Sequence, residues 1–138
     1  MRNLRPALAI VAGFAAMMVL AGILDLAARH LLSSALATKV SDGTMPIAAF
    51  VGGYIAARLS PNRGMLKGAL TFAPVLAAFL FGLLAYFYIN RVPLALVVES
   101  MLEPSQMTLL VLVIAGMAAA IAGGAFGAYM ARRVRGSR

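Results

Sequence analysis

Long stretches without a charged residue constrain this chain more than any other feature. The first, Ala7–Leu24, is 18 residues long, and comparable runs follow in the middle and last thirds of the chain. A transmembrane helix needs about 20 mostly apolar residues to cross a hydrocarbon core ~30 Å thick. The first run exceeds the apolar segment of a secretory signal, about 7–15 residues. We therefore expect an uncleaved membrane span there.

Composition supports the membrane class. Of the 138 residues, 63% are hydrophobic and 12% are charged, whereas soluble domains carry about 25% charged residues. The length allows about four spans and leaves no space for a separate soluble domain. The chain contains no cysteine, which excludes disulfides and thiolate metal sites.

We expect one all-α membrane domain over residues 1–138, with four transmembrane helices at about 7–28, 44–59, 65–89 and 107–131. Thr44 is a suitable N-cap for the second helix, with Pro46 in its first turn. At about 1.5 Å per residue, this helix is too short to cross the bilayer alone. It is expected to lie inside the bundle, or to be continued by residues 31–43, which suit the membrane interface.

The remaining spans carry their own signals. Pro74 should bend the third span because its ring removes one backbone hydrogen bond. Tyr86–Tyr88 close that span as an aromatic belt at the outer interface. A short helix is expected over residues 93–103 in the following loop. Pro104 should end it, and Ser105 can cap the fourth span.

Charge distribution predicts the orientation. Nine of the twelve basic residues fall at the N-terminus, the loop between spans two and three, or the C-terminus: Arg2, Arg5, Arg58, Arg63, Lys67, Arg132, Arg133, Arg135 and Arg138. The other side receives Arg29, Lys39, Arg91 and the four acids: Asp25, Asp42, Glu99 and Glu103. Basic short loops mark the cytoplasmic face. We therefore expect both termini inside, in the cytoplasmic (inner) membrane, with anionic lipids rather than nucleic acid beside the basic face.

Small residues recur every four positions in the second and fourth spans. The second carries Ala48-Gly52-Ala56 and Ala49-Gly53-Ala57. The fourth carries Gly116-Ala120-Gly124-Ala128 and Ala115-Ala119-Gly123-Gly127-Ala131. Small residues let helix backbones approach closely in lipid. These two spans should pack tightly, with each other inside the bundle. Alternatively, the fourth span has more small surface than one neighbour covers and also meets a second copy or another membrane protein.

Two stretches of the chain resemble each other. GGYIAARL (Gly52–Leu59) and GAYMARRV (Gly127–Val134) align without a gap at a separation of 75 residues. A duplicated helical hairpin in parallel orientation, as found among transporters, is one interpretation. Shared demands on the cytoplasmic end of a helix are the other.

The segment GGYIAARLSPNRGMLKGAL (Gly52–Leu70) resembles the central part of small uncharacterised bacterial membrane proteins with four spans. Those proteins have a GG-aromatic-x-Ala-x-Arg helix end, a short basic turn and a span opening with Gly-Ala. The resemblance covers about 20 of the 138 residues. It implies a four-helix membrane fold and no particular activity.

Few ionisable residues are placed to carry chemistry. Asp25 is the one acid within a predicted span, Arg29 follows one helical turn later, and His30 adjoins them. Intramembrane ionisable residues suggest proton or substrate binding, but an interfacial ion pair that ends the span, with His30 among the headgroups, is the favoured interpretation. Glu99 and Glu103 would share a helical face outside the membrane. That spacing suits acid–base chemistry or a divalent cation, or simply a solvated face.

No catalytic, cofactor-binding or metal-binding residues are predicted. The pattern favours a non-enzymatic membrane protein, either an accessory subunit of a larger membrane complex or a homo-oligomeric scaffold. The alternative is a small transporter or channel, for which Asp25 would be the one embedded carboxylate.

Overall fold

The computed structural model describes residues 4–32, 34–60, 62–93, 95–96, 99 and 103–136. Within them the chain forms four long helices and no strand: α1 (Leu4–Leu31), α2 (Ser34–Leu59), α3 (Gly64–Ile89) and α5 (Pro104–Gly136). Helices α1, α3 and α5 are long and apolar enough to cross a membrane. Helix α2 is as long as α3 but less apolar, because residues such as Lys39 and Asp42 occupy its first ten positions.

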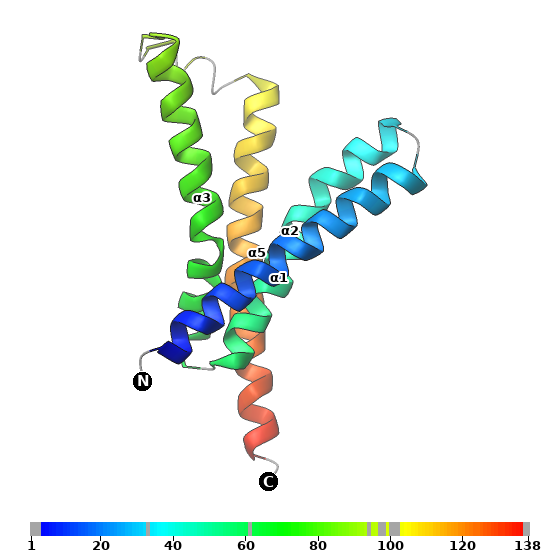
Figure 1. Cartoon of the computed structure of the whole chain (residues 1–138), viewed down its shortest axis with the longest axis vertical. Helices are drawn as coiled ribbons and strands as arrows, with labels where there is room; N and C mark the ends of the chain where they lie inside the picture. Colours follow the sequence, from blue (N-terminus) through cyan, green and yellow to red (C-terminus); the bar gives the residue numbers. More distant parts are fainter. Residues whose placement is uncertain are drawn as a thin grey trace.

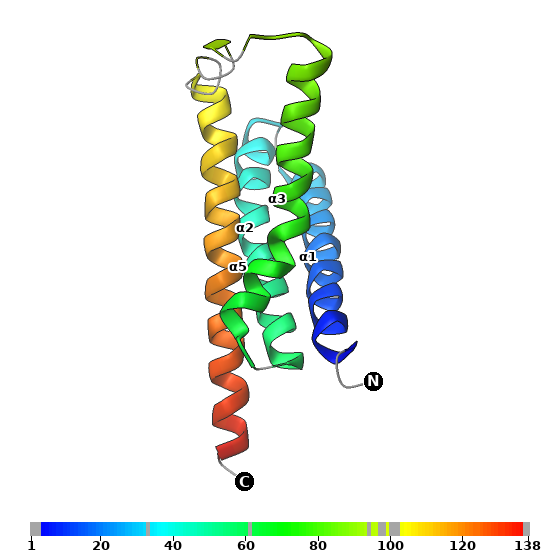
Figure 2. The same ribbon diagram turned by 90° about the vertical axis from the view of Figure 1, so that its left-hand side faces the viewer.

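The helices form two antiparallel pairs, α1 with α2 and α3 with α5 (Figures 1 and 2). The pairs pack together near the end that holds both chain termini and diverge toward the other end (Figure 1). Helix α2 is the central element because it contacts α1, α3 and α5, and its interface with α5 is the most extensive. Helix α5 extends beyond its neighbours at the C-terminal end (Figure 2).

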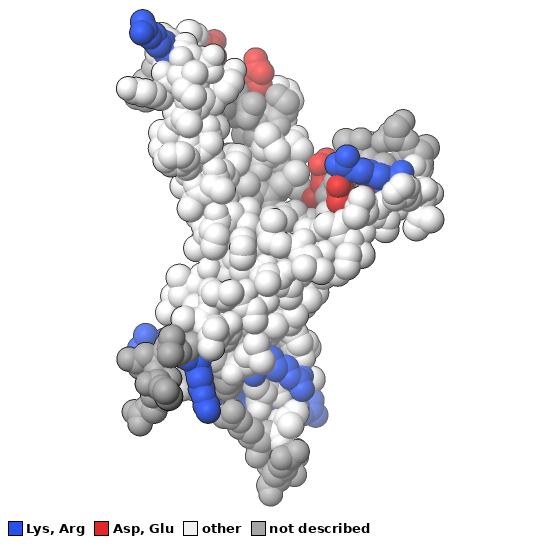
Figure 3. All heavy atoms as spheres, viewed as in Figure 1, with Lys and Arg blue, Asp and Glu red and all other residues white. Residues whose placement is uncertain are grey.

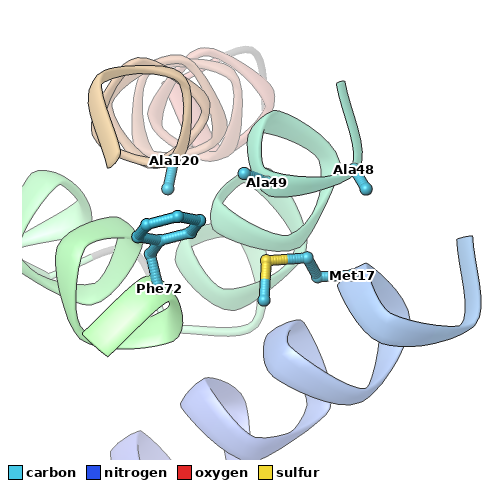
Figure 4. Packing of buried hydrophobic residues seen from close by; sticks show 5 residues of the cluster. All are labelled: Met17, Ala48, Ala49, Phe72 and Ala120. Atoms are coloured by element: carbon cyan, nitrogen blue, oxygen red, sulfur yellow. The ribbon is translucent and has the colours of Figure 1, made fainter. Parts of the chain in front are cut away.

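The hydrophobic core lies where all four helices meet. Its buried members are Met17, Ala48, Ala49, Phe72 and Ala120, and Figure 4 shows the Phe72 ring on the side of Ala49 and Ala120. The last buried residue of α3 is Phe72. Among the described residues of α5, Gly116 is the first that is buried. The halves of α3 and α5 distant from the termini therefore carry no described buried residue.

The start of the second helix was predicted wrongly. Helix α2 begins at Ser34, so Thr44 is not its N-cap and Pro46 lies inside the helix rather than in its first turn. Residues 34–43 continue the helix, which was one of the two alternatives for the short second span. Thr44, directly after this segment, is buried, whereas Leu36 and Val40 within it are exposed, so burial of these side chains does not account for the continuation.

The other helix ends differ less from expectation. Helix α5 begins at Pro104, the position where a missing N–H has no cost, so Ser105 does not cap it. Helix α3 contains Pro74 and changes direction in its lower half (Figure 2). Of the expected helix over 93–103, residues 95, 96 and 99 are helical, and 94, 97–98 and 100–102 lie outside the described residues.

Candidate functional site

Close backbone contacts join α2 to α5 at glycines. A Cβ atom added to Gly53 would collide with the carbonyl oxygen of Ala120, and one added to Gly123 would collide with that of Phe50. One added to Gly127 would lie 2.5 Å from the carbonyl oxygen of Tyr54. Real Cβ atoms do not approach other atoms this closely, so these positions admit only glycine without movement of a helix. The spacing of small residues thus permits the α2–α5 interface.

The other glycines of the predicted ridges face different helices of the same chain. Gly124 lies against the carbonyl oxygen of Gly64 at the start of α3, and a Cβ on Gly116 would lie 2.7 Å from the Phe72 ring. Gly52 faces α1, where an added Cβ would lie 2.7 Å from the carbonyl oxygen of Gly13.

These contacts bear on the idea that the fourth span meets a second copy through its surplus small residues. One ridge of α5 is covered by α2 and the other by α3. The four glycines of these two ridges are all buried within the single chain: Gly116, Gly123, Gly124 and Gly127. The small surface of α5 that α2 does not cover is therefore covered by α3. These glycines leave no open ridge for another copy.

The polar cluster lies in the last two turns of α1, far from the chain termini. The Arg29 Nε atom is 2.8 Å from the Asp25 Oδ2 atom, an i,i+4 ion pair. The Arg29 side chain is 70% exposed and that of Asp25 30% exposed, and His30 is exposed as well. Exposed pairs of this kind contribute about 0–1 kcal/mol. The geometry is that of a surface ion pair near a helix end.

A cavity of ≈1110 Å³ lies at the opposite end of the molecule from the termini. Its walls are mainly apolar, including Phe79 and Leu83 of α3 and Leu109 of α5. Glu99 and Glu103 both line it. The structure therefore brings the two predicted carboxylates to one hollow, whose remaining lining suits apolar groups.

Lys67 is a buried charged residue that sequence reasoning treated only as an orientation signal. Its Nζ atom donates to the Ser60 carbonyl oxygen at 2.5 Å and to the Ser60 hydroxyl at 2.6 Å. Ser60 follows the last residue of α2, so the lysine ties the end of α2 to the second turn of α3. The positive charge also suits the carbonyl-rich end of a helix. The one sequence feature that could have indicated this contact is the position of the lysine, one helical turn after the Pro-Asn-Arg-Gly turn.

Comparisons with protein-family models, curated proteins and solved structures gave no match to this chain.

Proposed function

We propose that this chain is a non-enzymatic inner-membrane protein that crosses the bilayer four times and serves as a subunit of a larger membrane assembly. A notch between the two helix pairs carries the proposal. The space-filling view shows this notch between the α3–α5 arm and the α1–α2 arm (Figure 3). Its α3–α5 side belongs to the helix halves that carry no described buried residue.

Length and charge support four spans with both termini inside. Helix α2 has 26 residues, which at ~1.5 Å per residue exceeds a ~30 Å hydrocarbon core. It runs antiparallel to α1 and packs along it. On the face shown in Figure 3, the end near the termini carries blue Lys and Arg side chains without red ones, whereas the other ends carry both colours. The positive-inside rule then orients the molecule, with anionic lipids beside the basic end.

The notch is a better candidate for the contact with a partner helix than the glycine ridges are. Helix association in lipid depends on packing and on hydrogen bonds, because lipid tails are as apolar as the helices. The glycines are already used within the chain. The diverging half of α5 instead exposes an apolar wall that includes Leu109, Leu110 and Val111. It faces the more polar first half of α2 across the notch, and a transmembrane helix of another subunit can pack against it.

Cross-linking tests this proposal. Leu112 precedes Gly123 by eleven residues, about three helical turns, so it continues the face of α5 that contacts α2. Ile114 lies two residues further on, nearly on the opposite face, and is exposed. A photoreactive residue at Leu112 should give one discrete product in native membranes, and the same residue at Ile114 should give none. Purification in mild detergent should recover the same partner, whose identity mass spectrometry establishes.

If both positions react only with lipid, and the protein elutes as a monomer, the subunit proposal is wrong. A cross-link between two copies of this chain would point to the homo-oligomeric scaffold.

Transport is the second candidate, favoured by the ≈1110 Å³ cavity that Glu99 and Glu103 line. Asp25 does not line this cavity, but it is the one acid within a predicted span. Asp25→Asn separates the two functions. A subunit should lose about 0–1 kcal/mol with Asp25 neutralised and keep its assembly and cellular role. A transporter that depends on this carboxylate should fold normally and lose activity. Arg91→Gln, a charge change at the same side of the membrane, is the matched control.

A further inference from the structure

A second groove lies at the basic end of the molecule, where α3 begins and α5 leaves the bundle. Its volume is ≈460 Å³. Arg63 and Arg132 both line it, one from the turn before α3 and one from the end of α5. The neighbouring Arg133 is exposed but does not line it. The groove is thus lined by two arginines that are 69 positions apart in the sequence.

The remaining lining is apolar or amphipathic. Met65 and Leu66 form part of the wall on the α3 side, and Ala125 and Tyr129 belong to α5. Both leucine and methionine are well exposed, and Tyr129 presents a phenol with an apolar ring. A ligand for this groove would carry a negative group for the arginines and a hydrocarbon portion for the side chains beside them.

The backbone of Arg63 adds a second observation. Arg63 has φ 56° and ψ 48°, in the left-handed region that glycine and asparagine adopt readily. Holding another residue there is unfavourable, and such residues concentrate at functional sites. Glycine would suit this turn better; Arg91, in the turn after α3, shares this backbone region, but it does not line the groove.

We propose that the groove between α3 and α5 binds one anionic phospholipid from the cytoplasmic leaflet. Its phosphate would lie between Arg63 and Arg132, and an acyl chain would extend along Met65 and Leu66. Guanidinium groups suit phosphate because they donate paired, charge-assisted hydrogen bonds. Basic pockets between transmembrane helices on the cytoplasmic side are a known setting for anionic headgroups. This inference rests on the membrane orientation proposed above, and not on the identity of any partner subunit.

The apolar lining favours a lipid over free phosphate. Inorganic phosphate would use the arginines and leave the hydrocarbon wall in contact with water. A phospholipid covers both, and the helices that form the groove already place it beside a leaflet.

Lipid retention tests the site. The full chain is reconstituted in nanodiscs of mixed phosphatidylglycerol and phosphatidylcholine, and native mass spectrometry measures which lipid stays bound. We expect preferential retention of one phosphatidylglycerol. Arg132→Gln should lower the ratio of phosphatidylglycerol to phosphatidylcholine by about fivefold, because a charge-assisted contact to the headgroup inside the groove is lost. Arg133→Gln makes the same charge change one residue away and should leave the ratio nearly unchanged.

Arg63→Gly provides an independent variant. Glycine suits the left-handed backbone, so the protein should fold at least as well as the wild type while the lipid ratio falls about fivefold. A residue with a purely structural role would not lower lipid retention while stability is kept. Added inorganic phosphate should not displace the lipid.

Equal losses from Arg132→Gln and Arg133→Gln would overturn the proposal, because a general basic surface would then explain the retention. Displacement of the lipid by inorganic phosphate would also overturn it. Either result could occur in a correctly oriented protein with its partner bound, so the proposed function would still stand. Failure of the chain to insert with its basic end inside would instead refute the function from which the site is argued.

Discussion

At the scale of single residues, this fold depends on glycines at the points where two helices meet, because any larger side chain there would collide with the neighbouring helix. At several positions a glycine faces a carbonyl oxygen of the neighbouring helix with no space for a Cβ atom between them, as at Gly53 with Ala120 and Gly123 with Phe50. Such contacts bring large areas of two helices into van der Waals range, which is the main attraction between helices in lipid. Other glycines play no such part, since a Cβ on Gly22 or Gly82 would have no atom within 4 Å.

The contrast between Gly53 and Gly82 gives a matched pair of substitutions. Gly53→Ala places a methyl group onto the Ala120 carbonyl oxygen, so the helices must separate, and overpacking of this kind costs about 1–3 kcal/mol. Gly82→Ala meets open space and should stabilise α3 by about 0.5–1 kcal/mol through helix propensity. Equilibrium unfolding in detergent measures both. If the two variants have the same stability, α2 and α5 do not pack as closely as described.

Lys67 permits a second test at this scale. Lys67→Met should cost about 1.5–3 kcal/mol of unfolding free energy because the Ser60 carbonyl and hydroxyl lose a charged donor. Ser60→Ala removes only the hydroxyl and should cost about 1 kcal/mol. The same unfolding measurement ranks the two variants. A Lys67→Met protein more stable than the wild type would mean that desolvation of the buried ammonium outweighs its hydrogen bonds.

At the scale of helices, sequence patterns located the apolar elements well and their polar ends poorly. The predicted spans 65–89 and 107–131 lie within α3 and α5, because long apolar runs need only composition to be found. Residues 34–43 were assigned to the interface because Lys39, Ser41 and Asp42 interrupt the apolar pattern. In the structure this segment forms the first ten positions of α2, although its polar residues gave no sign of a continuing membrane helix.

For the candidate-site residues, too, the sequence predicted some features and missed others. The small-residue spacing identified glycines that do make close contacts, but it could not say which helix each would meet. Gly52 and Gly127 are equivalent in the aligned stretches, yet Gly52 faces α1 and Gly127 faces α2. The two stretches thus occupy different environments. The tie from Lys67 to Ser60 and the shared groove of Arg63 and Arg132 depend on how helices are placed, which residue spacing does not encode.

Pro46 tests the corrected start of α2. Inside a helix, proline removes a backbone hydrogen bond and crowds the preceding turn, whereas in the first turn it costs almost nothing. Pro46→Ala should therefore stabilise the protein by about 1–3 kcal/mol, since proline costs ~3 kcal/mol in a helix interior. Hydrogen–deuterium exchange should show greater protection in residues 40–46, and Pro74→Ala serves as the comparison within α3. Unchanged stability and exchange would instead favour a helix that begins near Thr44.

At the scale of the whole molecule, the two helix pairs are joined at the basic end and separate toward the other. Small residues and the core concentrate where the pairs meet, and both chain termini lie at that end (Figure 1). The opposite end holds the Asp25–Arg29 pair, the carboxylate-lined cavity and the exposed aromatic residues Tyr86 and Tyr88. A closely packed half near the termini and an open half at the other end suit a protein that is completed by another helix.

The number of spans decides the relation of the two termini, because an even number places them on the same side and an odd number on opposite sides. Helix α2 is the element at issue, since the other three are the clear candidates by hydropathy. The antiparallel packing of α1 and α2, together with nine of twelve basic residues at one end, predicts four crossings with both termini inside. A reporter active only in the periplasm should be silent when fused after Arg138 or within Ser60–Gly64, and active within 93–103. A cytoplasmic reporter fused before Met1 should be active. An active periplasmic reporter at Ser60–Gly64, with the N-terminus still inside, would mean that α2 does not cross and would reduce the fold to three spans.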